Sequence, residues 1–138
     1  MNETAKPGLL AQLRELITGK SSVEKVADDP ALMAELLLLV RMSFADRGIK
    51  PAEALAFKSI CSRALGLNED EAGDIVHFLD DFGYETTNEQ AAHMLAGLSE
   101  LRRREIMDHM ATIARSDGEV SEEERKLFHE TARQLGLE

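Results

Sequence analysis

The sequence lacks tryptophan, contains one cysteine, Cys61, and only 4% of its residues are aromatic. A single cysteine excludes an internal disulfide framework and fits a reducing compartment. The longest apolar run, Leu36–Val40, is far shorter than the roughly 20 residues that a membrane-spanning helix needs. Residues 1–13 also lack the apolar stretch of a signal peptide. We therefore expect a cytoplasmic protein without a transmembrane segment.

Positive charge is scarce, because 16 Lys and Arg stand against 26 Asp and Glu, for a net charge of -10. Such a surface repels phosphate backbones, so the composition argues against nucleic acid as a partner. It suits cations or basic protein surfaces instead. The sequence also contains no glycine-rich phosphate loop, nucleophile elbow or paired catalytic acid signature, and we therefore predict that the protein is not an enzyme.

Alanine and leucine dominate, and apolar residues recur at spacings of three and four without any long alternating stretch. This pattern predicts an all-α bundle of about seven helices, with a short capped turn at Ser21. Capping boxes are expected at Ser21–Glu24, Asn68–Glu71, Thr87–Gln90 and Ser121–Glu124, and Gly66 is expected as a left-handed helix cap. The predicted helices begin near Pro7, Pro30, Pro51 and Glu69 and after the caps Thr87, Ser99 and Ser121.

Two segments, the first elbow (residues 42–53) and the second elbow (residues 113–124), resemble each other. A shift of 71 places Asp46 on Asp117 and Phe57 on Phe128, whereas a shift of 70 aligns residues 63–67 with residues 133–137. One residue has therefore slipped between the two registers. We interpret the pattern as an internal duplication of a helix–turn–helix pair with an approximate twofold axis.

This repeat divides one domain, residues 1–138, into four parts. They are an N-terminal helix with its connection (1–28), the first repeat (30–67), intervening helices (68–98) and the second repeat (99–137).

The acids of the two elbows are the candidate site residues. Asp117 lies near the negative end of a helix, where the helix dipole disfavours it by about 0.3–1 kcal/mol. Two interpretations remain open. Either Asp117 accepts N–H groups of the following turn while Glu124 caps Ser121, or both acids hold a divalent cation together with turn carbonyls.

Glycine and proline are expected to shape both turns. Gly118 is predicted to have positive φ, with Ser121 as the helix cap. In the first elbow the corresponding acids are Asp46 and Glu53, and the turn residues are Gly48 and Pro51.

Several other residues are interpreted as structural. Cys61 falls on an apolar stripe and is expected in the core. The four histidines are expected at the surface, Arg102–Arg104 on a solvated helix face, and Val120 on the buried face of the last helix.

The segment Ala114–Glu124 resembles the signature of the TerB-like family of bacterial tellurite-resistance proteins, and the likeness extends from about Ala31 to Leu137. The resemblance implies an all-α bundle of stacked helix pairs in a bacterial cytoplasmic or membrane-associated stress system. Relatives also occur as the N-terminal domain of membrane-anchored J-domain co-chaperones, and the family's paired acids have been linked with metal binding. The first elbow departs from the signature, since Arg47 replaces the glycine and Lys50 and Pro51 replace the cap.

The leading hypothesis is a non-enzymatic acidic interaction module of a tellurite-resistance-like stress response, which binds a protein partner or a membrane-associated complex. The alternative is a divalent-metal-binding protein that uses the elbow acids. The sequence indicates no definite cofactor, and a divalent cation is the candidate that the alternative requires.

Overall fold

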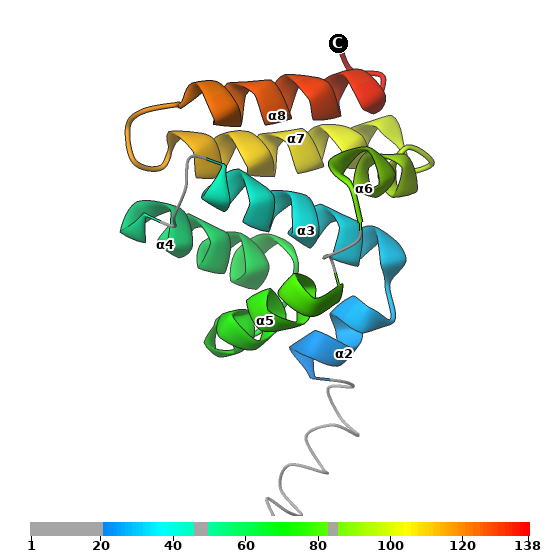
Figure 1. Cartoon of the computed structure of the whole chain (residues 1–138). Coiled ribbons are helices and arrows are strands. Elements are labelled where there is room, and N and C mark those ends of the chain that lie inside the picture. Colours follow the sequence, from blue (N-terminus) through cyan, green and yellow to red (C-terminus); the bar gives the residue numbers. More distant parts are fainter. Residues whose placement is uncertain (1–20, 46–49, 83–85) are drawn as a thin grey trace, which may run out of the picture.

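The computed structural model describes residues 21–45, 50–82 and 86–138. Within these ranges the chain forms seven α-helices, one π-helical turn and one 3-10 turn, and no strand, which confirms the predicted all-α fold (Figure 1). The elements are α2 (Ser22–Ala27), α3 (Pro30–Phe44), α4 (Pro51–Ser59), the π turn η1 (Ile60–Ala64), the 3-10 turn η2 (Glu69–Glu71), α5 (Ala72–Phe82), α6 (Asn88–Leu95), α7 (Glu100–Arg115) and α8 (Glu122–Gln134). The helix predicted after Pro7 lies outside the described residues, and α2 corresponds to the capped turn expected at Ser21.

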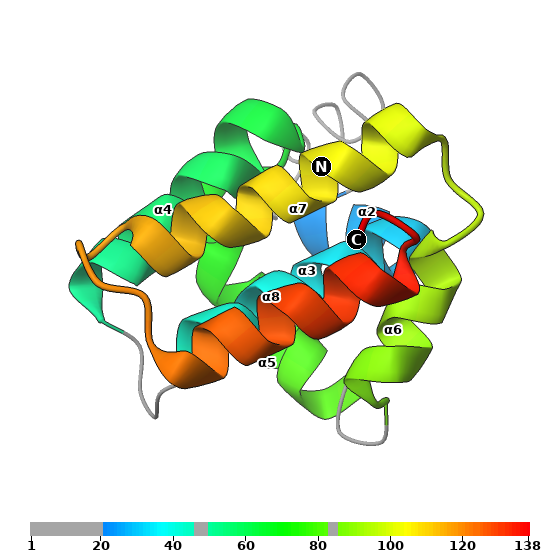
Figure 2. The same ribbon diagram turned by 90° about the horizontal axis from the view of Figure 1, so that it is seen from above.

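Helix α3 is the centre of the bundle. Every other α-helix of the described chain contacts it, namely α2, α4, α5, α6, α7 and α8. Its residues Leu36 to Leu39 are at most 4% exposed. A helix surrounded in this way needs apolar residues on all its faces, which explains the leucine run. Viewed from above, α7 and α8 lie over α3, with α4 and α6 toward opposite ends (Figure 2).

Most helix starts follow the predicted caps. Capping boxes are present at Ser21, Thr87 and Ser121, and the Asp29 side chain accepts a hydrogen bond from the N–H of Leu32. These interactions join residues three apart, so the local sequence is sufficient to specify them.

The capping box predicted at Asn68–Glu71 is wrong. Asn68 accepts the N–H of Asp70, and a 3-10 turn precedes α5, which begins at Ala72. The Glu71 carboxylate accepts the N–H of Ser22 instead, at 3.0 Å, while the Ser22 hydroxyl accepts the N–H of Asn68 at 2.8 Å. Packing of α2 against α5 thus offers Glu71 a backbone donor other than the one in its own helix start.

The π turn η1 gives a physical account of the register slip between the two elbows. Phe57 and Arg63 are one residue further apart than Phe128 and Arg133. A π turn places one extra residue in a helix without ending it, and here the N–H of Leu65 bonds to the carbonyl of Ile60, five residues back. Both helical runs then end at a glycine with positive φ, Gly66 at 67° and Gly136 at 74°. The duplication itself remains a prediction.

One expected core position in α8 is wrong. Val120 is 38% exposed, because α8 begins at Glu122 and Val120 stands in the turn before the cap Ser121. The buried face of this helical segment consists of Leu127, Thr131 and Leu135.

Candidate functional site

The second elbow is an Asx-type turn followed by a capped helix. The Asp117 carboxylate accepts the N–H of Glu119 at 3.1 Å, and Gly118 adopts a φ of 88°. Both features agree with the turn interpretation of this segment. A side chain at Gly118 would meet no atom within 4 Å, so the positive φ is the reason that glycine suits this position.

Ser121 and Glu124 form the expected reciprocal capping box. The Ser121 hydroxyl accepts the N–H of Glu124 at 3.0 Å, and Glu124 Oε1 accepts the N–H of Ser121 at 2.8 Å. Glu124 is only 1% exposed, and its Oε2 has no hydrogen-bond partner in the described part of the chain. Negative charge in the first turn is favourable because the helix dipole is positive there.

The first elbow is described at residues 42–45 and 50–53. Asp46 and Gly48 lie outside the described residues. Pro51 occupies the first turn of α4 as predicted, and Glu53 Oε1 accepts the N–H of Lys50 at 3.4 Å. Glu53 is buried, as Glu124 is. The Lys50 side chain cannot accept the N–H of Glu53 in exchange, because an ammonium group has no acceptor atom.

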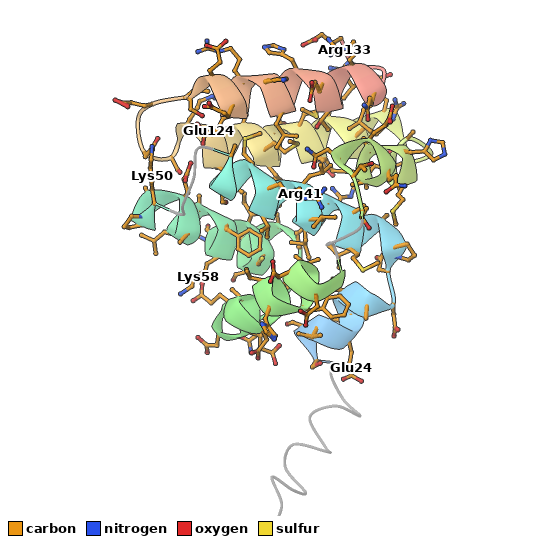
Figure 3. The ribbon with its side chains drawn as sticks, in the orientation of Figure 1. Glu24, Arg41, Lys50, Lys58, Glu124 and Arg133 are labelled. Atoms are coloured by element: carbon orange, nitrogen blue, oxygen red, sulfur yellow. The ribbon has the colours of Figure 1, made fainter. Side chains whose placement is uncertain are left out.

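Lys50 joins the two elbows. Its Nζ lies 2.8 Å from Asp117 Oδ2, and Lys50 and Glu124 lie at the same end of the bundle (Figure 3). The bond to the Lys50 ammonium group, followed by the N–H of Glu119, lowers the pKa of Asp117. Sequence reasoning treated Lys50 only as a departure from the family signature, so it missed this contact.

Three of the four candidate acids, Asp117, Glu124 and Glu53, accept hydrogen bonds from backbone N–H groups of their own turns. Within residues 21–45, 50–82 and 86–138, no three potential ligands converge on a metal position.

A second cluster, which the sequence did not predict, surrounds Glu35 in the middle of α3. Glu35 is fully buried. Arg102 Nη2 lies 2.5 Å from its Oε1, and His109 Nδ1 lies 2.7 Å from its Oε2. We refer to Glu35, Arg102 and His109 as the Glu35 cluster. The positive charge of Arg102 and the hydrogen bond with His109 offset the free-energy cost of burying the Glu35 carboxylate.

The Glu35 cluster corrects two predictions. His109 is not a free surface residue, and Arg102–Arg104 is not simply a solvated face. Arg103 donates to the carbonyls of Leu98 and Leu135, whereas Arg104 pairs with Glu100 on the exposed face of α7. Two signals in the sequence were available: a lone acid inside the apolar run of α3, and an arginine and a histidine seven residues apart on one face of α7.

Cys61 is a buried thiol close to this cluster. It is fully enclosed, as predicted. Burial, and secondarily the charge of Glu35, raises the pKa of the thiol to about 12. The thiolate that reacts as a nucleophile is therefore scarce at neutral pH.

Negative charge is unevenly distributed along the chain. Between Arg63 and Arg102 there are nine acidic residues and no lysine or arginine, whereas the rest of the chain has 17 acids and 16 bases. The segment includes η2 and α5, where Glu69, Asp70, Asp74, Asp80 and Asp81 are exposed. Counting charge by segment, and not over the whole chain, would have located this acidic region from the sequence.

The fold and the second elbow define an all-helical domain in which a capped, acidic helix–turn–helix closes the bundle. A family model described as Tellurite resistance protein TerB matches residues 31–138. Because the match covers most of the chain, the chain belongs to the TerB family, which confirms the resemblance noted in the sequence. No curated protein and no solved structure matched the chain.

The family places the protein among tellurite-resistance-related helical domains. In the described ranges, no helix has both the length and the apolar character needed to cross a bilayer.

Proposed function

We propose that this TerB domain is a non-enzymatic interaction module of a bacterial stress response, working in the cytoplasm. It would bind a basic protein surface, on a free protein or on a membrane-associated complex. The observation that supports this proposal most directly is the acidic region of η2 and α5, which has no lysine or arginine of its own.

The charge arrangement favours docking over a purely solubilising role. Seven of the 16 Lys and Arg follow Leu101, on α7 and α8, so these two helices have both positive and negative side chains. The η2–α5 region has only negative ones. A surface with one sign of charge accelerates encounter with an oppositely charged partner, and the effect decreases as salt is added.

A pull-down from the native cell tests the proposal with two triple variants. The first neutralises α5 by Asp74→Asn, Asp80→Asn and Asp81→Asn. The matched control removes the same charge from exposed positions of the α7–α8 region, by Asp108→Asn, Glu119→Gln and Glu123→Gln. We expect the α5 variant to lose the partner and the control to retain it, and we expect wild-type binding to weaken at high salt. Equal binding by both variants, or binding indifferent to salt, would remove the proposal.

Divalent-cation binding at the elbows is the second candidate function. It would use Asp117 and Glu124, with Asp46 and Glu53 from the first elbow. The observation that favours it is Glu124 Oε2, a buried carboxylate oxygen without a hydrogen bond in the described residues. Hard cations prefer oxygen ligands of this kind.

Thermal unfolding in Ca²⁺, Mg²⁺ or Zn²⁺ tests this second function. A metal present at 100 times its dissociation constant stabilises the folded state by about 2.7 kcal/mol, and Asp117→Asn or Glu124→Gln should abolish that gain. An unchanged melting temperature at millimolar metal would exclude the elbows as a cation site.

A further inference from the structure

A cavity of about 530 Å³ opens beside the Glu35 cluster. It lies between the start of α3, helix α7 and the π turn η1, and Leu32, Leu65 and Leu98 line part of it. Its volume falls within the range of about 300–1,000 Å³ that is usual for small-molecule sites. Such sites combine an apolar wall with a few polar groups that fix orientation, and this cavity has both.

The polar part of the cavity places a cation beside an anion. Arg102 uses one N–H for Glu35, and its guanidinium makes no other hydrogen bond among the described residues. Glu105, one turn further along α7, lies with its Oε1 3.7 Å from Arg102 Nη1, which is too long for a hydrogen bond. Both side chains line the cavity, and they are 32% and 53% exposed. Donors and acceptors therefore remain for a ligand.

His109 adds a third polar group with a defined orientation. Its Nδ1 bonds to Glu35, which leaves Nε2 as the ring atom for a ligand. A simple anion would meet Arg102 but also the carboxylates of Glu105 and Asp29, and a simple amine would meet the guanidinium. Only a ligand that has a negative and a positive group close together matches both Arg102 and Glu105.

We propose that this cavity binds a zwitterionic small molecule that has its ammonium and carboxylate groups on one carbon and an apolar side chain, as a free aliphatic amino acid has. The carboxylate pairs with the open N–H groups of Arg102, and the ammonium group pairs with Glu105. The side chain lies against Leu32, Leu65 and Leu98. This site is separate from the elbows and from the acidic region of α5, and it does not depend on the proposed function.

Three probes with one carbon skeleton test the proposal by calorimetric titration of the full chain. L-leucine has both charges, isocaproate lacks the ammonium group and isoamylamine lacks the carboxylate. We expect leucine to bind saturably and each analogue to bind about tenfold more weakly or worse, because each loses a charge-assisted contact. Binding of isocaproate or isoamylamine as tight as that of leucine, or no saturable binding of any probe at millimolar concentration, would overturn the proposal.

A matched pair of variants on α7 separates the site from general charge effects and leaves the Glu35 cluster intact. Glu105→Gln removes the ammonium partner, whereas Asp108→Asn removes an exposed charge outside the cavity lining. We expect Glu105→Gln to weaken leucine binding about tenfold without weakening isocaproate binding, and Asp108→Asn to change neither. Unchanged melting temperatures check that both variants fold. An equal loss of leucine binding in the two variants would contradict the assigned contact.

Discussion

Glu35 on α3 and Glu124 on α8 are both enclosed, with exposed fractions of 0% and 1%, but their charges are stabilised differently. Glu35 stands in the middle of a helix, where the backbone N–H groups are used within the helix, and side chains of α7 reach it from 67 and 74 residues away. Glu124 stands in the first turn, where backbone N–H groups remain available, and it bonds to the N–H of Ser121.

The difference between Glu35 and Glu124 shows at which helix positions a buried carboxylate needs a charged partner. In mid-helix the backbone offers it no donor, so removal of the partner leaves an uncompensated charge. In the first turn the backbone donor and the positive end of the helix dipole stabilise the carboxylate without a cation. The two glutamates should therefore respond differently to the same substitutions.

The largest expected effect comes from removing the guanidinium at Glu35. Arg102→Met should lower the free energy of unfolding by about 3 kcal/mol, because Glu35 stays buried with only His109 beside it. Urea unfolding followed by helical circular dichroism measures the change. Arg104→Met is the matched control, since the partner of Arg104 among the described residues is the exposed Glu100, and it should cost less than about 1 kcal/mol. Similar losses for both would show that Glu35 does not depend on Arg102.

A pair of isosteric substitutions tests the comparison itself. Glu35→Gln should cost about 2 kcal/mol, because the charge-assisted contacts with Arg102 and His109 are lost. Glu124→Gln should change stability by less than about 1 kcal/mol, since the amide oxygen can still accept from Ser121. The same unfolding experiment applies to both variants, and a larger loss for Glu124→Gln would reverse our interpretation.

The backbone of the second elbow gives the next effect in size. Gly118→Val should cost about 1–2 kcal/mol, because a β-branched residue is strained at a φ of 88°. Gly97→Ala, at a glycine of ordinary φ with no atom within 4 Å of an added Cβ, should be close to neutral. Thermal melts compare the two, and an unchanged melt of Gly118→Val would argue against the elbow geometry.

The smallest expected effect concerns the ion pair between the elbows. Lys50 lowers the pKa of Asp117, so Asp117 adds stability that is present above its unfolded pKa of about 3.9 and is lost as pH falls through its folded pKa. Lys50→Met should raise the pKa of Asp117 toward its ordinary value and flatten the dependence of stability on pH in that acidic window.

Carboxyl NMR titration of Asp117 measures the shift directly. Lys58→Met, on the exposed part of α4, serves as the control and should leave the Asp117 titration unchanged. An unaltered pKa in Lys50→Met would mean that the ion pair is not formed in solution.

Features fixed within a few residues were accessible from the sequence. The caps at Ser21, Thr87 and Ser121 and the positive φ of Gly66 and Gly118 were predicted correctly. Each depends on a side chain and a backbone group at most a few positions apart, so the local residues are sufficient.

The predictions failed for side chains whose hydrogen-bond or ion-pair partners lie on elements distant in the sequence. Glu71 was expected to cap its own helix, but α2 packs beside it and offers the N–H of Ser22. His109 and Arg102 were interpreted as surface residues because their partner, Glu35, lies on another helix. The Lys50–Asp117 contact was missed for the same reason, since it joins two turns 67 residues apart.

The sequence by itself therefore determined the helical class, most of the helix caps, the form of the second elbow and the family of this protein. Tertiary structure alone decided which buried charges meet, where the cavity beside Glu35 opens, and how the two elbows are joined. The physical reason is range: caps and turns satisfy backbone groups within one helical turn, whereas a buried charge is matched by whatever the packing of α3 against α7 brings within hydrogen-bond distance.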